Sequence, residues 1–309
     1  MTSPAAPAQA PGTTHRFTFT TSDGAQLRAL EDGAPDAPLT VVLLHAWTMD
    51  STCWDRVVAG LVRHDPAVRI LRFDLRGHGG SDPAPRGGAS LERCADDLAE
   101  LITGEVPTGQ VVLAGHSMGG MATMALAERH PQLVAERVAA LALVASSSGD
   151  LAEPTYRLPR PAAQALNRFE RAVLRPLLEK ARSSRISRSS RLLAPAMRWL
   201  VFGKDPDRAD VARSAELFAS CHPASTAGYR CALAEHERTP ALETFRQVPV
   251  VLLAGLRDRL CPRPHADRIF RALPHAEYYL YPGAGHMLPW ERTTEVTRRL
   301  HAMVRSAAR

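Results

Sequence analysis

Lysine is almost absent from this chain of 309 residues, because only Lys180 and Lys204 occur and arginine supplies the rest of the 38 basic side chains. Aromatic residues are also few, at 6%. A preference for arginine of this kind fits an arginine-biased genome as well as it fits a function. The net charge of +6 therefore identifies no partner by itself.

Long apolar runs are missing as well. No run of 18 apolar residues occurs, which excludes a membrane-spanning helix from the sequence given. The first residues, MTSPAAPAQAPGTTH, lack the charged and apolar regions of a secretion signal. We therefore expect a soluble, cytoplasmic protein with a disordered N-terminal tail over residues 1–14.

Cysteine is scarce and unpatterned. The five cysteines include no C-x-x-C pair, which disfavours a disulfide framework and a zinc site. We expect them to be reduced thiols, some of them buried. No cluster of metal ligands and no glycine-rich phosphate loop is visible, so the sequence predicts neither a metal nor another cofactor.

Strand and helix patterns alternate along the first half of the chain. Segments 15–20 and 25–31, joined by Ser-Asp-Gly, have the pattern of a β-hairpin. Four apolar, β-branched runs predict buried strands, and they lie at 38–47, 68–77, 110–115 and 138–146. Helical patterns separate them, at 51–64, 90–104 and 121–130. This alternation predicts an α/β fold with a mostly parallel central sheet flanked by helices.

The pattern changes at about residue 149. From there to residue 240 only helices are predicted, at 158–181, 189–203, 207–221 and 225–236. Strands and helices then alternate again, with strands at 248–255 and 276–283. We therefore divide the chain into a core of residues 15–148 and 241–309, and an all-helical insertion of residues 149–240.

The insertion carries the only concentrated charge. Between Arg157 and Arg191 there are nine arginines and one lysine but only two glutamates. Two interpretations stay open, a solvated helical face and a surface for an anionic partner such as an acidic carrier or a lipid surface. Only Tyr156 and Phe169 interleave with these arginines, which argues against a nucleic-acid groove.

The stretch LAGHSMGGMA at residues 113–122 connects a predicted strand to a predicted helix. Gly115 and Gly119 stand two positions on either side of Ser117. A turn this tight brings backbone atoms together and favours residues without a side chain at both flanks. The G-x-S-x-G pattern in this setting marks Ser117 as a candidate nucleophile.

A serine hydroxyl needs a base, and the base needs a group to orient it. Asp258 follows a buried strand, and His286 lies in a glycine-rich loop after the last strand. Parallel α/β sheets place such groups at one edge of the sheet, beyond the carboxyl ends of the strands. Asp258 and His286 are thus the candidate acid and base for Ser117, and Asp150, at another strand end, is the alternative acid.

With these motifs the chain resembles the α/β-hydrolase family, over about residues 15–306. GHSMGG resembles the nucleophile elbow of the family, HAWTMDSTCW its His-Gly-x loop, and FDLRGHGGSD its Asp-x-Arg-Gly-x-Gly-x-Ser segment. Within the family, the chain looks most like the lidded serine esterases found in actinobacteria. The resemblance implies that the insertion is a lid over an acyl pocket.

The resemblance also implies roles for other residues. The backbone N–H groups of Trp47 and Met118 would form the oxyanion hole, although Ala46 stands where the family pattern has glycine. Asp74, Arg76 and Asp82 would brace a loop. The side chains expected to line a substrate pocket are His45, His116, Trp199, Phe202, Phe218, His222 and Met287.

The expected function is hydrolysis of a carboxylic ester or thioester, a small molecule with a hydrophobic acyl group, through an acyl-enzyme. A serine nucleophile argues against the epoxide hydrolases and haloalkane dehalogenases of this fold, which use aspartate. Two alternatives stay open: transfer of the acyl group to an alcohol or to peroxide with the same triad, and a non-catalytic ligand-binding protein on the same fold.

Overall fold

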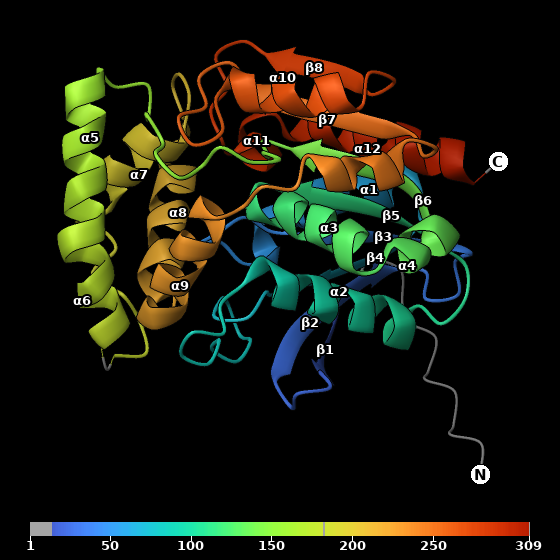
Figure 1. Cartoon of the computed structure of the whole chain (residues 1–309). Coiled ribbons are helices and arrows are strands. Elements are labelled where there is room, and N and C mark those ends of the chain that lie inside the picture. Colours follow the sequence, from blue (N-terminus) through green and yellow to red (C-terminus); the bar gives the residue numbers. More distant parts are fainter. Residues whose placement is uncertain (1–13, 182, 309) are drawn as a thin grey trace.

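The computed structural model describes residues 14–181 and 183–308, which form an eight-stranded sheet with helices on both faces (Figure 1). The strand order is β1-β2-β4-β3-β5-β6-β7-β8. The strands are β1 (His15–Thr20), β2 (Gln26–Gly33), β3 (Leu39–Leu44), β4 (Arg69–Phe73), β5 (Gln110–His116), β6 (Val138–Val144), β7 (Val250–Gly255) and β8 (Glu277–Tyr281). Only the β1–β2 and β2–β4 pairs are antiparallel.

The strands confirm the predicted hairpin and the predicted parallel sheet. In the hairpin, His15 pairs with Glu31 and Thr20 with Gln26. Every residue of β3 and of β7 is buried, because helices cover both faces of the sheet at these central strands. This explains why those segments are continuous apolar runs and show no alternation.

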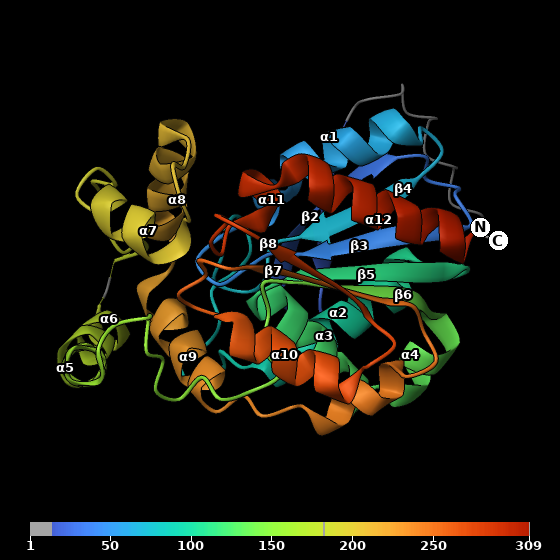
Figure 2. The ribbon, with the colours of Figure 1, turned by 90° about the horizontal axis from the view of Figure 1, so that it is seen from above.

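Two helical layers enclose the sheet (Figure 2). One face is covered by α1 (Asp55–His64), α11 (Leu288–Glu291) and α12 (Thr293–Ala307), and the other by α2 (Leu91–Glu105), α3 (Met118–Arg129), α4 (Pro131–Arg137) and α10 (Arg263–Ala272). Two apolar clusters fill the space between the sheet and these layers. Short 3-10 turns, η1 (Ser51–Trp54) and η3 (Pro240–Phe245), complete the core.

The segment between β6 and β7 is helical, as the sequence predicts. It contains α5 (Arg160–Phe169), a π-helical turn η2 (Glu170–Leu174), α6 (Arg175–Lys180), α7 (Ala194–Val201), α8 (Arg208–Ser220) and α9 (Pro223–Ala234). Figures 1 and 2 show these helices together beside the sheet, with α5 and α6 farthest from it. We call residues 149–240 the inserted segment.

The loop after β4 contains the residues predicted to brace it. Arg76 is 2% exposed and its Nε contacts Asp97 Oδ2 at 2.6 Å. Asp74 accepts the backbone N–H groups of Ser51 at 2.9 Å and Gly80 at 2.8 Å. A buried arginine and a buried carboxylate are tolerated here because each is paired or hydrogen bonded.

Three short elements have no counterpart in the sequence prediction, namely α4, α11 and η3. Each is seven residues or shorter, which leaves too little sequence for a helical period to appear. The predicted disordered tail, residues 1–14, falls outside the described residues except for Thr14. The hydroxyl of Thr14 donates to Asp32 Oδ1 at 2.6 Å, so this one residue of the predicted tail contacts the core.

Candidate active site

Ser117 lies in the turn that joins β5 to α3. Its φ of 53° and ψ of −115° are a strained backbone conformation for a residue with a side chain. A Cβ on Gly115 would approach the Gly120 nitrogen to 2.3 Å, and one on Gly119 would approach the Leu44 carbonyl oxygen to 2.5 Å. The two glycines therefore allow the chain to turn sharply and hold Ser117 at the carboxyl edge of the sheet.

His286 and Asp258 form a buried pair at the same edge. The Nδ1 atom of His286 lies 2.7 Å from Asp258 Oδ2, and the side chains are 3% and 0% exposed. The other carboxylate oxygen, Oδ1, accepts the N–H groups of Leu260 at 2.8 Å and Cys261 at 2.9 Å. The aspartate is thus fixed in place, and the ring presents Nε2 away from it.

The surroundings of Asp258 favour its charged form. Burial raises the pKa of this carboxyl, but the His286 ring and the two N–H groups outweigh burial and hold the pKa below its ordinary value. Asp150, the alternative acid, is exposed and its backbone N–H donates to Glu237. The histidine is therefore paired with Asp258.

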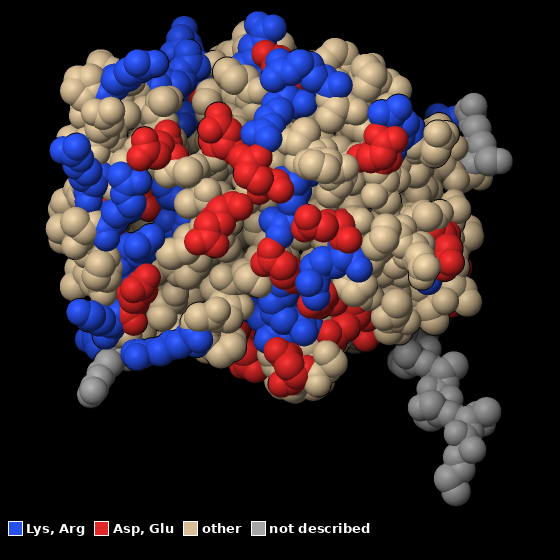
Figure 3. Space-filling model, viewed as in Figure 1, with Lys and Arg blue, Asp and Glu red and all other residues tan. Residues whose placement is uncertain are grey.

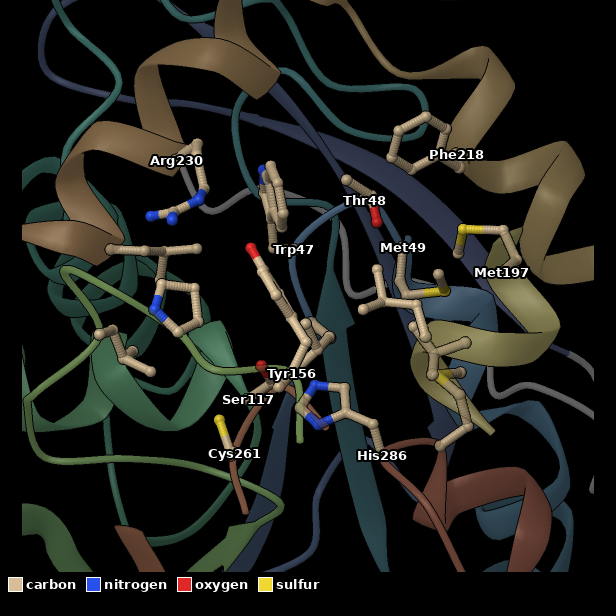
Figure 4. Close-up of a pocket in the computed structure, with 18 of the residues that line it drawn as sticks. Trp47, Thr48, Met49, Ser117, Tyr156, Met197, Phe218, Arg230, Cys261 and His286 are labelled. Carbon is tan, nitrogen blue, oxygen red and sulfur yellow. The ribbon is translucent and has the colours of Figure 1, made fainter. Parts of the chain in front are cut away.

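A cavity between the core and the inserted segment contains Ser117 and His286 (Figure 4). Its wall is mostly apolar. The apolar lining residues are Ala46, Trp47, Met49, Met121, Leu151, Pro154, Met197, Leu200, Val201, Phe218, Leu233, Leu260 and Met287. Four more polar or polarisable side chains line it, namely Thr48, Tyr156, Arg230 and Cys261.

The predicted oxyanion hole consists of the backbone N–H groups of Met118 and Trp47. Met118 follows Ser117 in the sequence, and Trp47 lines the cavity. Among the described residues, neither Met118 N–H nor Trp47 N–H has a hydrogen-bond acceptor. Met118 is the first residue of α3, where the helix dipole is positive. Ala46 has no positive φ, whereas Thr48 has one of 63°, so the Cβ of Ala46 adds no backbone strain next to Trp47.

The loop that carries His286 is held by a half-buried carboxylate and by the inserted segment. Glu291 accepts the N–H groups of Gly285 at 3.0 Å and Met287 at 3.1 Å, on either side of His286. The carbonyl of Val201, at the end of α7, accepts the His286 N–H at 2.8 Å. Burial raises the pKa of Glu291, while these N–H donors favour its carboxylate form.

The structure does not bring all the predicted pocket residues to the cavity. Phe218 and Met287 line it, but His45, His116 and Phe202 are buried elsewhere in the core. His45 Nε2 accepts the Leu75 N–H at 2.9 Å, and His116 Nε2 contacts the His286 carbonyl at 2.8 Å, so both rings support backbone.

Two more predicted pocket residues lie at the surface of the inserted segment. Trp199 is 39% exposed, and the guanidinium carbon of Arg259 lies 5.3 Å from its ring centroid. His222 precedes α9 and accepts the Ser225 N–H at 3.3 Å as a helix cap. Their place in an insertion that resembles a lid does not specify which face of a helix turns inward, because only the packing of the helices decides this.

Most of the residues that line the cavity were not predicted, and three of them carry side chains that could contact a substrate through a polar or sulfur atom. Tyr156 lies in a loop, Arg230 in the middle of α9, and Cys261 three positions after Asp258. Only Cys261 has a local signal, its closeness to the candidate acid. Burial raises the pKa of its thiol well above the ordinary value, so Cys261 stays protonated and is not a competing nucleophile.

The described residues contain no group of three or more His, Cys, Asp or Glu side chains that could hold a metal ion. All five cysteines are free, and Cys53, Cys94, Cys221 and Cys261 are buried. In the part of the chain that the structure describes, no helix is both long and apolar enough to cross a bilayer.

Comparison with known proteins is consistent with this geometry. The sequence profile of the alpha/beta hydrolase family matches residues 41–299. Pimeloyl-[acyl-carrier protein] methyl ester esterase of Nitrosomonas europaea is 27% identical over 260 residues, which cover 80% of this chain and 88% of that protein. The enzyme of the same name from Aromatoleum aromaticum is 30% identical over 248 residues, with 80% and 90% covered.

Solved structures share the fold. An esterase from Thermogutta terrifontis superposes with a TM-score of 0.72 at 24% identity, covering 95% of this chain and 99% of that one. The enol-lactonase of Burkholderia xenovorans superposes with a TM-score of 0.73 at 23% identity, covering 93% and 99%. The two esterases named above come from proteobacteria, so the predicted actinobacterial branch stays a prediction.

Proposed function

The chain belongs to the alpha/beta hydrolase family of enzymes, and we propose that it hydrolyses a carboxylic ester or thioester of a hydrophobic acyl group through an acyl-enzyme formed on Ser117. One observation carries the proposal. The strained Ser117 turn and the His286 ring, paired through Nδ1 with Asp258, face the same apolar cavity.

The proposed reaction starts with attack of Ser117 Oγ on the acyl carbon. The proton of the hydroxyl passes to Nε2 of His286, because Nδ1 is occupied by Asp258. The N–H groups of Met118 and Trp47 stabilise the negative oxygen of the tetrahedral intermediate. Nε2 then returns the proton to the leaving alcohol or thiol, which departs and leaves the acyl group on Ser117.

Water then hydrolyses the acyl-enzyme, with water in the place of the serine hydroxyl as the nucleophile and Ser117 as the leaving group. Nε2 of His286 takes a proton from the water, the water oxygen attacks the acyl carbon, and the bond to Ser117 Oγ breaks as the serine regains a proton. The carboxylate of Asp258 holds the ring and favours its positive form in both halves of the reaction. Its lowered pKa keeps it ionised at neutral pH.

The cavity wall supports a hydrophobic acyl group. Methionine and leucine side chains predominate, and flexible methionines adapt to substrates of different shape. The inserted segment supplies Met197, Val201 and Phe218 to this wall, so we propose that it is a lid that covers the acyl group. Two relatives are named as pimeloyl-[acyl-carrier protein] methyl ester esterases, which supports an ester as the substrate. The apolar cavity wall supports a hydrophobic acyl group in that ester.

A covalent probe and a substrate series test the proposal. We expect a fluorophosphonate to label Ser117 in the wild-type protein and no residue in Ser117→Ala. In a series of p-nitrophenyl esters and acyl thioesters from acetyl to dodecanoyl, kcat/KM should rise with acyl length, because each buried methylene contributes about 0.8 kcal/mol. Hydrolysis that persists in Ser117→Ala would contradict the mechanism, and a series that favours acetyl would contradict the hydrophobic acyl group.

A further inference from the structure

Exposed large hydrophobic side chains are concentrated in one part of the molecule. Among the described residues, all seven lie between positions 166 and 199 of the inserted segment. They are Leu166, Phe169, Val173, Leu174, Leu177, Leu192 and Trp199. A contiguous exposed apolar surface marks a site of interaction with a protein, a membrane or a ligand.

Five of these side chains belong to one continuous helix. The elements α5, η2 and α6 follow each other without a break over residues 160–180, a length of about 30 Å at 1.5 Å per residue. Leu166, Phe169, Val173 and Leu177 recur at intervals of three, four and four, which places them on one face of the helix. Phe169 is 53% and Leu177 65% exposed. We call these four residues the outer stripe.

A neighbouring face of the same helix packs against the protein. Ala163 and Asn167 are buried. Glu170 Oε1 lies 2.6 Å from Arg230 Nε, and Tyr156 donates its hydroxyl to Glu170 Oε2 at 3.3 Å. Because Arg230 and Tyr156 line the cavity, Glu170 places this helix directly behind two lining side chains, and its apolar stripe is exposed to solvent.

Positive charge surrounds the outer stripe. The helix contains five basic and two acidic residues over 160–180. Arg185, Arg188 and Arg191, in the loop that follows, are exposed. Figure 3 shows Lys and Arg side chains gathered along the edge of the molecule that α5 and α6 occupy. Within the described residues, the ion pairs on this helix are Arg171–Glu153, Arg175–Glu179 and Arg230–Glu170, so two of its four arginines, Arg160 and Arg168, take part in none of these pairs.

We propose that the outer stripe docks the protein on an anionic lipid surface. An apolar stripe bordered by cationic side chains is the composition of helices that lie in the interface of a bilayer, where the stripe enters the acyl region and the cations meet the headgroups. A second copy of this chain fits less well, because two such surfaces would bring like charges together. This role would bring the inserted segment, which supplies part of the cavity wall, close to the lipid, which is a source of hydrophobic esters, and this last point rests on the proposed function.

Vesicle sedimentation with the full chain tests the docking. We expect the protein to bind vesicles that contain phosphatidylglycerol and phosphatidylcholine, and to bind pure phosphatidylcholine vesicles at least tenfold more weakly. The binding should weaken as salt rises, because the Debye length falls from about 10 Å at 0.1 M to about 3 Å at 1 M. The double variant Phe169→Ser/Leu177→Ser should lower the partition coefficient at least tenfold, because it removes the two most exposed apolar side chains of the outer stripe, and with them the apolar area that enters the bilayer.

Matched variants show whether the outer stripe and its arginines are the surface that meets the lipid. Arg168→Glu/Arg171→Glu should weaken binding to anionic vesicles, while Arg271→Glu, an exposed position on α10, should leave it unchanged. Ser117→Ala should bind as the wild type does, so that a failure of the proposed function does not affect this test. Binding that survives Phe169→Ser/Leu177→Ser, or no binding by the wild type, would overturn the proposal. So would a dimer in light scattering that the same double variant converts to monomer.

Discussion

The carboxylate of Glu291 accepts the backbone N–H of Gly203 at 2.8 Å, and through the same side chain it holds the loop of His286. Gly203 belongs to the inserted segment, just beyond α7. One half-buried acid therefore joins the loop of His286, the proposed base, to the inserted segment, so the position of this loop depends on the position of that segment.

Glu291→Gln should lower activity more than it lowers binding of the substrate. An amide has one acceptor oxygen and no charge, so it cannot serve all the N–H donors that the carboxylate serves, and each hydrogen bond to a charged group contributes about 1.5–3 kcal/mol. We expect kcat to fall about tenfold or more while KM changes little, together with a lower Tm. Glu243→Gln, at an exposed glutamate on η3, is the matched control and should change neither value. If activity and the fraction of folded protein fell to the same extent, Glu291 would have only a structural role.

Asp258→Asn should abolish most of the activity without unfolding the protein. The amide cannot stabilise the positive His286 ring or hold its tautomer, and loss of this function in a triad lowers kcat roughly 10⁴-fold. Asp150→Asn should retain near-normal turnover, because Asp150 is exposed and lies outside the pair. Steady-state kinetics with circular dichroism on both variants checks this. The reverse ranking of the two variants would show that the acid has been assigned wrongly.

The stability of the protein should fall between pH 6.5 and about pH 4. Burial lowers the pKa of His78 and His116 to about 3 and that of His236 to about 4, and it also lowers the pKa of His45. The unfolded chain binds protons at these histidines below about pH 6.5, whereas the folded chain does not. Each histidine thus removes up to about 1.4 kcal/mol of unfolding free energy per pH unit, and the loss grows as the pH falls.

Urea denaturation across this pH range measures the effect. His78→Gln should make the dependence of the unfolding free energy on pH less steep, by the amount that one buried histidine contributes. His275→Gln, at an exposed position, should leave the dependence unchanged. A stability that is constant from neutral pH down to about pH 5 would contradict the view that these rings are held neutral.

Arg230 and Glu170 should be coupled, so that replacing both changes stability less than replacing Arg230 alone and also changes the substrate preference. Both side chains are mostly buried, at 14% and 15% exposed, so Arg230→Met leaves Glu170 without its partner and should cost about 3 kcal/mol. The double variant Arg230→Met/Glu170→Leu should recover most of this loss. Because it also makes that wall of the cavity apolar, we expect it to raise kcat/KM for long alkyl esters relative to acetyl esters. Additive losses in the two single variants would show that the two residues do not interact.

Local sequence determined most of the helices and strands and the turn that carries Ser117, the proposed nucleophile. Gly115 and Gly119 flank Ser117 in a turn that a Cβ at either position would obstruct, and this requirement is visible in six consecutive letters. The apolar runs of the central strands predicted a parallel sheet, because only strands covered on both faces have no alternation. The order of the strands then places the ends of β5, β7 and β8 at one edge, which is why Asp258 and His286 could be named in advance.

The tertiary structure alone decided what surrounds that pair. His45 and His116 stand next to motif residues, yet their rings bond backbone groups and do not reach the cavity. Arg230 and Tyr156 reach it from α9 and from a loop, although nothing near them in sequence indicates chemistry. Helical spacing specifies which residues share a face, but the packing partner specifies which face turns inward. Helix 160–180 packs on α9, and this packing leaves the outer stripe exposed to solvent.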